Sequence, residues 1–258
     1  MAIVSVIVPV HKPNPEWLNF ALESVRSQTY PVELVVVEDT ESKGAWDARN
    51  RGLERATGDY IAFCDADDYM EPYAIERMVA AMDGVDMVVG SFRKFGEWEQ
   101  TVSHPQATWD MGEVARYVIE NLWHPMNNQL LSGCWAKLYR RHFVDRFPAL
   151  TTAEDMAFNF DYLARTCSYV RVVEDVVYNN RKHSASLSTT FDERDKGGLF
   201  RVLEALRYVR RFLVDYNDEA IIDSAIDHSK AYHAMLYYMR ICNQTKLPMR
   251  EVLMKLYA

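Results

Sequence analysis

Short apolar runs alternate with amphipathic segments along the first 92 residues of the chain. The runs have the length and the nearly continuous apolar character of strands that are buried on both faces of a parallel sheet. The segments between them carry apolar residues at helical spacing. This alternation predicts an α/β domain with a mostly parallel central sheet that is flanked by helices. The expected strands lie at 5–10, 33–37, 60–64 and 85–92, and the expected helices at 15–28, 46–56 and 72–82.

The pattern becomes mixed in the middle of the chain and wholly helical after residue 192. We therefore expect one α/β domain over residues 1–191, followed by a helical extension over residues 192–258. The further elements expected are helices at 112–122 and 154–166, short strands at 169–173 and 176–178, and helices at 199–216, 219–242 and 249–257.

Composition narrows the class of protein. Of 258 residues, 49% are hydrophobic, which is typical of a globular chain with a sizeable core. The net charge of −8 argues against a nucleic-acid-binding protein, because such proteins normally present a basic face. The four cysteines form no C-x-x-C pair, so we expect reduced thiols rather than disulfides or a zinc site. No apolar run reaches 18 residues, so we expect no signal peptide and no membrane span.

An acidic turn follows the expected strand at 60–64. Asp65, Asp67 and Asp68 lie within four residues, and Asp65 and Asp67 have the spacing that places two side chains on the same side of an extended segment. Carboxylate oxygens suit Mg²⁺ or Mn²⁺, the ions that pair with substrate phosphates. The alternative is a simple turn in which Asp68 caps the helix that follows.

Three of the expected parallel strands end in segments that contain polar residues. These segments are Pro9-Val10-His11, Glu38-Asp39 and Asp65-Ala66-Asp67. Ligands of open α/β sheets bind at the carboxyl ends of the strands, so the three groups are expected to lie together. The chain has neither a G-x-G-x-x-G motif nor a G-x-x-x-x-G-K-S/T motif, which argues against a dinucleotide-binding enzyme and a P-loop NTPase. The remaining possibility is a ligand that carries phosphate and is held through a metal ion.

A series of motifs follows in order along the chain, in the segments at 5–11, 33–39, 48–53, 58–68, 133–141, 153–158 and 178–188. Together these motifs resemble the family 2 inverting glycosyltransferases of the GT-A fold, and the resemblance covers about residues 3–190. That fold would divide the α/β domain into a donor half (about 1–92) and an acceptor half (about 93–191).

The resemblance implies where a nucleotide sugar would bind. Asp67 would bind the metal ion, Mn²⁺ or Mg²⁺, that bridges the diphosphate, and Asp65 with Ala66 would contact the ribose side. Two of the implied base and ribose contacts have plainer explanations: Asp39 as a turn-forming residue, and Arg49 as part of an ion pair on a helix surface. The implied base and ribose contacts are Pro9, Val10, His11, Asp39 and Arg49.

The resemblance also implies the catalytic and downstream residues. Asp155 would be the general base, whereas Glu154 is explained by the preference of acidic residues for a helix N-terminus. His183 would ligate the metal ion, with a hydrogen bond to the diphosphate or a structural role as alternatives. Arg181 would balance the charge of the diphosphate, or simply offset the acidic domain.

The expected function is therefore metal-dependent transfer of a sugar, with inversion, from a UDP-sugar or related donor to a hydroxyl of a glycan or lipid-linked glycan. The alternatives are a sugar-1-phosphate nucleotidyltransferase and a non-catalytic glycan-binding domain. We expect a cytoplasmic location. The C-terminal helices could pack on the domain, form a homodimer contact or attach to the inner face of the membrane. Only eight residues separate Asp39 from Ala48, and Glu38 replaces a more usual Asp, so the donor pocket is expected to be reshaped.

Overall fold

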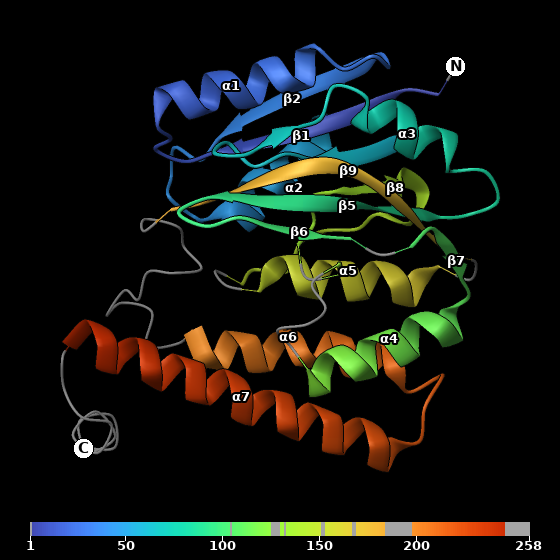
Figure 1. Cartoon of the computed structure of the whole chain (residues 1–258), viewed down its shortest axis with the longest axis vertical. Helices are drawn as coiled ribbons and strands as arrows, with labels where there is room; N and C mark the ends of the chain where they lie inside the picture. Colours follow the sequence, from blue (N-terminus) through green and yellow to red (C-terminus); the bar gives the residue numbers. More distant parts are fainter. Residues whose placement is uncertain are drawn as a thin grey trace.

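The computed structural model describes residues 2–103, 105–124, 130–131, 133–150, 153–166, 169–183 and 198–245. A central sheet runs through the domain in the strand order β2-β1-β3-β8-β5-β9-β4. Five of these strands point in the same direction, so that their carboxyl ends meet at one edge (Figure 1). This arrangement confirms the predicted fold class. The five strands are β1 (Val4–Val10), β2 (Val32–Glu38), β3 (Tyr60–Phe63), β5 (Met87–Gly96) and β9 (Val170–Lys182).

Four short strands were not predicted. The most consequential is β8, which lies antiparallel between β3 and β5 and so joins the two halves of the sheet. β4 pairs with β9, β6 pairs with β5, and β7 pairs with β9, all antiparallel. Each has two to four residues, too few for a periodic pattern to indicate a strand. The bounds are Tyr69–Met70 for β4, Gln100–Val102 for β6, Ala107–Trp109 for β7 and Lys137–Arg140 for β8.

The prediction of two separate strands at 169–173 and 176–178 was wrong. Residues 170–182 form the single strand β9, which pairs with β5 along its length. Irregularities in the register lie between Gly90 and Phe92, where three extra residues of β9 are accommodated without ending the strand. The polar pair Glu174-Asp175 at this point explains why the sequence suggested a break.

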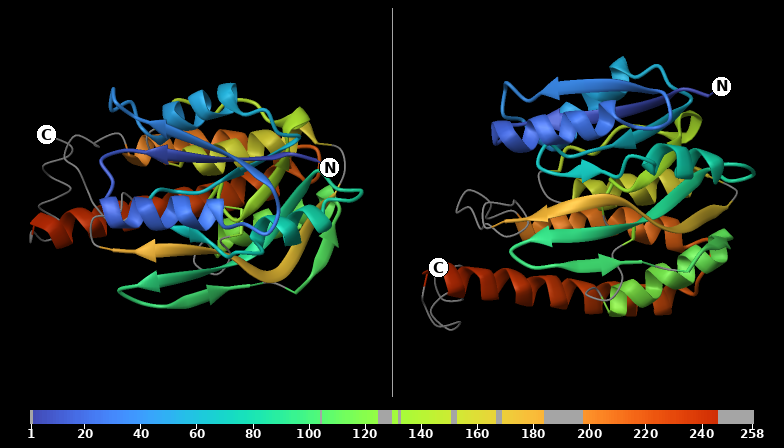
Figure 2. Two further views of the ribbon diagram at one scale, coloured as in Figure 1. Left: turned by 90° about the horizontal axis from the view of Figure 1, so that it is seen from above. Right: turned by 45° about the horizontal axis from the view of Figure 1, so that its top comes forward.

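Helices cover both faces of the sheet. α1 (Pro15–Arg26) and α3 (Ala74–Ala80) lie on one face, and α2 (Ala45–Arg55) and α5 (Glu154–Arg165) lie on the other (Figure 2, left). Gly52 lets α2 approach β1 closely, since a Cβ at this position would lie 2.4 Å from Ile7 Cγ2. On the same face, Phe158 of α5 packs against Phe63 of β3 at a ring distance of 5.8 Å. These helices position the carboxyl edge of the sheet from both sides.

A further layer lies beyond α5. α4 (Met111–Trp123), α6 (Gly198–Leu213) and α7 (Glu219–Thr245) stack beneath it, and a short 3₁₀ helix (Arg141–Phe143) follows β8 (Figure 1). The apolar face of α6 packs inward, with Leu206 and Val209 buried. Among the described helices, none combines the length and apolar character needed to cross a bilayer. The predicted helix at 249–257 lies outside the described residues. The boundary at 191/192 does too, so it stays a prediction.

Candidate active site

The acidic turn after β3 is anchored to β9 through Asp68. The Asp68 carboxylate accepts hydrogen bonds from Tyr178 Oη (2.9 Å), Asn180 Nδ2 (2.8 Å) and the backbone N–H of Arg181 (2.6 Å). Burial and the neighbouring Asp67 charge raise the pKa of Asp68 well above its usual value. The alternative of Asp68 as a helix cap was wrong, because α3 begins at Ala74 and Asp68 bonds to β9 instead.

Asp67 and His183 lie side by side, although 116 residues separate them in the chain. His183 Nε2 is 3.0 Å from Asp67 Oδ2, and the side chains are 20% and 41% exposed, respectively. Among the described residues, no group of three or more His, Cys, Asp or Glu side chains is arranged to hold a metal ion. A catalytic Mg²⁺ or Mn²⁺ needs only one or two protein ligands when substrate phosphates and water supply the rest. The pair therefore fits such an ion.

Arg181 is held between two aromatic rings beside this pair. Its guanidinium lies 4.8 Å from the ring of Trp17 on α1 and 4.6 Å from the ring of Phe95 on β5, and its Nε donates to the Asp67 carbonyl at 2.9 Å. Trp17 also contacts the His183 ring at 4.9 Å. Sequence reasoning missed Trp17 and Phe95, because each occupies an ordinary apolar position within its own element.

Arg49 of α2 joins three carboxylates at the centre of the site. Its Nη2 bonds to Asp65 (2.9 Å), and its Nη1 bonds to Glu154 (2.9 Å) and Asp155 (2.7 Å). The Arg49 side chain is 4% exposed, so it is not on a helix surface. Burial raises the pKa of Asp65 to about 6, although the Arg49 charge opposes this shift. The ion pair expected for Arg49 is present, but its partners come from distant segments.

Asp155 lies in the first turn of α5, two residues after a residue with unusual backbone geometry. Ala153 has a φ of 61°, in the left-handed region that residues with a Cβ rarely adopt. This conformation turns the chain into α5 and directs Glu154 and Asp155 toward Arg49. Burial and the Asp155 charge raise the pKa of Glu154 to about 7. Glu154 therefore has a definite partner in the site, beyond the helix-terminus role expected for it.

Asp39 has a structural role at the end of β2. Its two carboxylate oxygens accept hydrogen bonds from the backbone N–H groups of Lys43 (3.0 Å) and Gly44 (2.9 Å), and its side chain is 2% exposed. His11, which follows β1, places Nδ1 3.3 Å from Asp39 Oδ2. These contacts give Asp39 the turn-forming role considered as the alternative. The implied contacts of Pro9, Val10, His11, Asp39 and Ala66 with a nucleotide stay predictions.

The loop before β8 is fixed by three buried side chains. Lys137 Nζ donates to the carbonyls of Gly133 (2.5 Å) and Trp135 (3.3 Å), and burial lowers the Lys137 pKa to about 8. Asn159 also donates to Gly133 (2.9 Å), and Tyr139 Oη donates to Cys134 (3.1 Å). The fixed loop stacks Trp135 on Tyr178 with ring centroids 5.1 Å apart. Tyr178 in turn accepts a hydrogen bond from Asp65 N.

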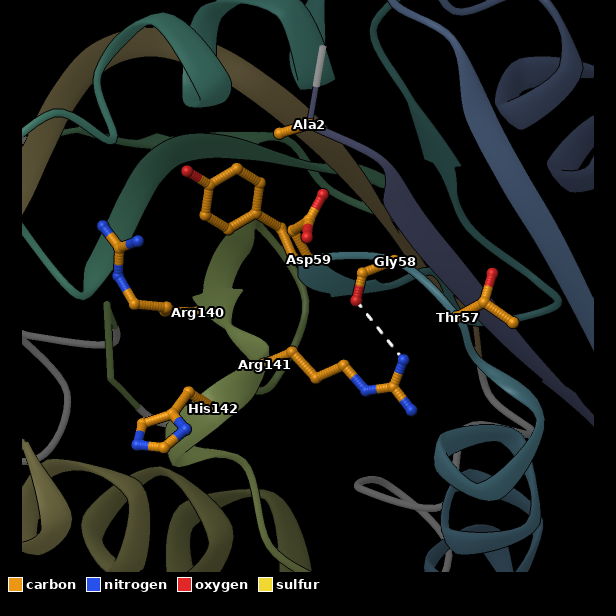
Figure 3. A pocket seen from close by; sticks show the side chains of 8 residues that line it. Ala2, Thr57, Gly58, Asp59, Arg140, Arg141 and His142 are labelled. Carbon is orange, nitrogen blue, oxygen red and sulfur yellow. Dashed lines mark hydrogen bonds between the residues drawn. The ribbon is translucent and has the colours of Figure 1, made fainter.

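A shallow depression lies at the opposite end of β1 and β3. It is lined by Ala2, residues 57–60 and residues 140–142, and Arg141 Nη1 donates to the Gly58 carbonyl at 3.5 Å (Figure 3). None of the candidate site residues lines it. Parallel sheets bind ligands at the other end of their strands, so this depression is not the candidate site.

Comparisons with known proteins agree with this geometry. A model of the glycosyl transferase family 2 matches residues 40–143, which include Arg49, Asp65 and Asp67. Residues 1–349 of TarS from S. aureus, solved in complex with UDP-GlcNAc, superpose with a TM-score of 0.66 at 19% identity, covering 86% of this chain and 70% of that one. The sheet and its acidic strand end thus define the GT-A fold.

Curated relatives point to the same family. EpsH of Bacillus subtilis, a putative glycosyltransferase, is 27% identical over 74% of this chain and 64% of its own length. TarP of Staphylococcus aureus, a poly(ribitol-phosphate) β-N-acetylglucosaminyltransferase, is 25% identical over 66% of this chain and 60% of its own length. The chain thus spans somewhat less than two thirds of these relatives. These similarities support a family 2 glycosyltransferase of the GT-A fold.

Proposed function

We propose that this chain transfers a sugar from a nucleoside diphosphate sugar, with UDP as the first candidate nucleotide, to a hydroxyl of a glycan or lipid-linked glycan. The observation that carries the proposal is the convergence at one edge of the sheet of Asp65 and Asp67 after β3, Asp155 on α5 and His183 after β9. The acidic turn that carries Asp65 and Asp67 therefore lies close to the candidate base, because Arg49 bonds to both Asp65 and Asp155.

Transfer proceeds by a single displacement with inversion. The acceptor oxygen attacks the anomeric carbon as the bond from that carbon to the diphosphate oxygen breaks. Asp155 takes the proton of the attacking hydroxyl, and the electron pair of the broken bond leaves with the nucleoside diphosphate. A positioned general base typically contributes about 10²–10⁴-fold to the rate. One carboxylate suffices for this route, because no covalent intermediate forms.

Asp67 and His183 are the residues that would hold Mn²⁺ or Mg²⁺ near the leaving diphosphate. When bound, the ion supplies positive charge that stabilises the departing diphosphate. A neutral imidazole suits Mn²⁺ better than Mg²⁺, so Mn²⁺ is the first candidate. Arg181, adjacent to this pair, adds a fixed positive charge on the same side of the site. UDP-GlcNAc, present in the TarS complex, is the first donor sugar to test.

The base assignment is tested with Asp155→Asn. Purified protein is supplied with a panel of UDP-sugars, Mn²⁺ and glycan acceptors, and transfer is measured as nucleoside diphosphate released with product formed. We expect Asp155→Asn to lose about 10²–10⁴-fold in kcat with little change in donor binding. Asp83→Asn, at an exposed turn, is the matched control and should retain full activity. Full activity in Asp155→Asn would overturn the assignment.

The metal site is tested by calorimetry of UDP with and without Mn²⁺. Asp67→Ala and His183→Ala should each abolish the Mn²⁺-dependent part of binding, whereas Asp215→Ala, at an exposed position, should not. Binding that is equally strong without the ion would exclude a metal-dependent donor site. The same samples separate the alternatives. Pyrophosphate release from a nucleoside triphosphate would indicate a nucleotidyltransferase, and glycan binding without any turnover would indicate a non-catalytic domain.

A further inference from the structure

We propose that the hairpin of β5 and β6 binds a negatively charged acceptor glycan. Trp98 contacts a sugar ring, and Lys94 and Lys182 attract the charged group. The inference rests on the proposed function and deepens it, because it names the chemical class of the acceptor as a glycan with phosphate or carboxylate groups. Three observations carry it: the place of the hairpin beside the candidate site, the exposure of the Trp98 ring, and the position of the two lysines.

The turn between β5 and β6 lies beside the end of β9, at the carboxyl edge of the sheet (Figure 1). The backbone N–H of Glu97 donates to the Lys182 carbonyl at 3.1 Å. Gly96 has a φ of 116°, and a Cβ at this position would collide with the same carbonyl oxygen, so the turn requires a glycine here. The hairpin is thus fixed next to His183, which follows Lys182 in the chain.

Trp98 in this turn exposes a large aromatic ring. The residue is 47% exposed, whereas tryptophan is highly buried on average. Lys94 Nζ lies 5.3 Å from its ring, within the range of a cation–π contact, and Gln100 Oε1 accepts from the same Nζ at 3.4 Å. These contacts hold the ring at the hairpin while almost half of the residue is open to a ligand. The C–H groups of a sugar pack well on such a ring, because its face carries partial negative charge.

Lys94 and Lys182 lie on the same face of the sheet. In the register of β5 with β9, Lys94 is opposite Asn180, and Lys182 is two residues further along β9. Burial and the Lys182 charge lower the pKa of Lys94 to about 8, a value that leaves most of its ammonium groups charged at neutral pH. Two neighbouring positive charges repel each other, and an anion bound between them would remove that repulsion.

The charge of the hairpin is opposite to that of the acidic part of the site. The carboxylates of Asp65, Asp67 and Asp155 repel a negatively charged acceptor. Lys94 is 6% exposed, so water weakens its attraction for an anion only a little. Complementary charge determines the orientation of a ligand as well as its affinity. The hairpin therefore favours an acceptor whose charged group lies away from the hydroxyl that reacts.

A row of aromatic rings connects the hairpin with the acidic turn. Lys94 Nζ lies 5.9 Å from the ring of Phe92, and that ring meets the Trp135 ring edge-on with centroids 4.6 Å apart. Trp135 stacks on Tyr178, whose hydroxyl accepts from Asp65 N at 2.9 Å. Because Phe92 is buried, the row fixes the position of the hairpin and does not itself form the binding surface. Packed supports of this kind keep a binding group in a set geometry relative to the reacting centre.

The test measures the binding of cellulose and chitin tetrasaccharides by calorimetry, in the presence of UDP and Mn²⁺. Each is supplied in a neutral form, a form phosphorylated at O6, and a form oxidised to the carboxylate at C6. We expect wild type to bind a charged form about tenfold more tightly than the neutral form, the usual effect of a hydrogen bond to a charged group. The charged form that binds more tightly identifies phosphate or carboxylate as the recognised group. Equal affinity for the three forms, or no binding of any of them, would overturn the proposal.

Substitutions at the hairpin separate the two contacts. Lys94→Met should abolish the preference for the charged form, whereas Lys94→Arg should keep most of it. Trp98→Leu should weaken the binding of every form about fivefold, and Trp98→Phe, which retains a ring, should restore most of that loss. An unchanged preference in Lys94→Met would contradict the subsite. Lys94→Arg and Trp98→Phe keep the test open if a more drastic variant fails to fold, which unfolding curves will reveal.

Lys230→Met is the matched control. Lys230 forms an exposed i,i+3 pair with Asp227 at 2.8 Å on α7, so its loss removes one positive charge away from the hairpin. This variant should bind all three forms as wild type does. The affinity for UDP in Mn²⁺ should be the same in every variant, because the hairpin is assigned to the acceptor. A weaker preference in Lys230→Met equal to that in Lys94→Met would mean that net charge alone attracts the glycan, and would overturn the proposal.

Binding and turnover distinguish this inference from the proposed function. If wild type transfers no sugar but binds charged tetrasaccharides through Lys94, the proposed function fails and the hairpin subsite stands. If wild type does transfer sugar, Lys94→Met should raise KM for the charged acceptor about tenfold while kcat stays within about twofold. A fall in kcat with KM unchanged would overturn the subsite, because it would place Lys94 at the reacting centre.

Discussion

Two groups of charged side chains share the carboxyl edge of the sheet, and they differ in how far their side chains are buried. In the Arg49 cluster (Arg49, Asp65, Glu154 and Asp155), a guanidinium that is 4% exposed bonds to all three carboxylates. In the Asp67–His183 pair, the side chains are 41% and 20% exposed. The first group is buried and paired through Arg49, and the second is more exposed to solvent.

Because of this difference, substitutions in the two groups should have different effects on stability and on binding. Charges that are removed from water and paired internally contribute to the folded state, because loss of one partner leaves the other buried and uncompensated. Substitution of a partly exposed group changes the free energy of unfolding little, but it can change the affinity for a ligand. Substitutions in the Arg49 cluster should therefore alter the free energy of unfolding as well as catalysis. Substitutions beside the Asp67–His183 pair should alter nucleotide affinity alone.

The largest effect is expected for Arg49→Met. The change leaves three carboxylates without their guanidinium, and breaking a buried ion pair in this way typically costs about 3–5 kcal/mol. The free energy of unfolding in urea at pH 7.5 should fall by this amount. Arg51→Met, which removes a part-exposed i,i+4 pair, should cost less than about 1 kcal/mol. Equal losses in the two variants would mean that the buried cluster contributes no more to the free energy of unfolding than a part-exposed ion pair.

Glu154→Gln should change how stability depends on pH. The pKa of Glu154 is raised from 4.5 to about 7 by burial and by Asp155, so the folded chain favours its protonated form. The resulting stabilisation is full below the unfolded value and is lost as the pH rises through about 7. Wild type should lose about 2 kcal/mol between pH 5 and pH 8.5 that Glu154→Gln retains. Urea unfolding at both pH values checks this, and parallel pH dependences would contradict it.

Arg181→Lys tests the more exposed of the two groups, because Arg181 lies beside the Asp67–His183 pair. A lysine keeps the charge but lacks the planar guanidinium that contacts Trp17 and Phe95 and the Nε that donates to the Asp67 carbonyl. We expect UDP affinity in Mn²⁺ to fall about tenfold, or about 1.4 kcal/mol, with less change in the free energy of unfolding. Arg77→Lys, at an exposed position on α3, serves as the control for calorimetry. Loss of stability without loss of affinity would place Arg181 with the structural residues instead.

The smallest effect is expected for Ala153→Gly. Ala153 holds a left-handed backbone conformation that costs a residue with a Cβ about 1–2 kcal/mol, part of which a glycine regains. The variant should be more stable by about 0.5–1 kcal/mol. Ala164→Gly, within the same helix and exposed, should instead lose about 1 kcal/mol. Thermal unfolding of both variants checks the opposite signs, and destabilisation by Ala153→Gly would show that the alanine side chain is needed there.

The strands of the donor half and the convergence of their polar ends could be predicted from the sequence. Long apolar runs such as 5–10 and 33–37 identify their own strands, and the carboxyl-end rule brings Asp39 and Asp65 to the same edge. The position of β8 could not be predicted, because its four residues carry no period and its partners β3 and β5 lie far away in sequence.

The partners of individual side chains could not be predicted from the sequence either. Arg49 meets Glu154 across 105 residues, and nothing local to α2 indicates that its partners are carboxylates of β3 and α5. Trp17 looked like any apolar helix position, yet it contacts both His183 and Arg181. Such contacts depend on how elements pack, whereas propensity and periodicity describe each element alone.

The attachment of the acidic turn to β9 has a consequence for how the chain acquires its site. The three bonds that fix Asp68 span 110 to 113 residues, and His183 reaches Asp67 across 116. Closing so long a loop costs conformational entropy, so contacts of this sequence separation are expected to form after local structure. During synthesis, the acidic turn emerges long before β9. Docking of β9 is therefore the step that brings His183 to Asp67 and completes the bonds to Asp68.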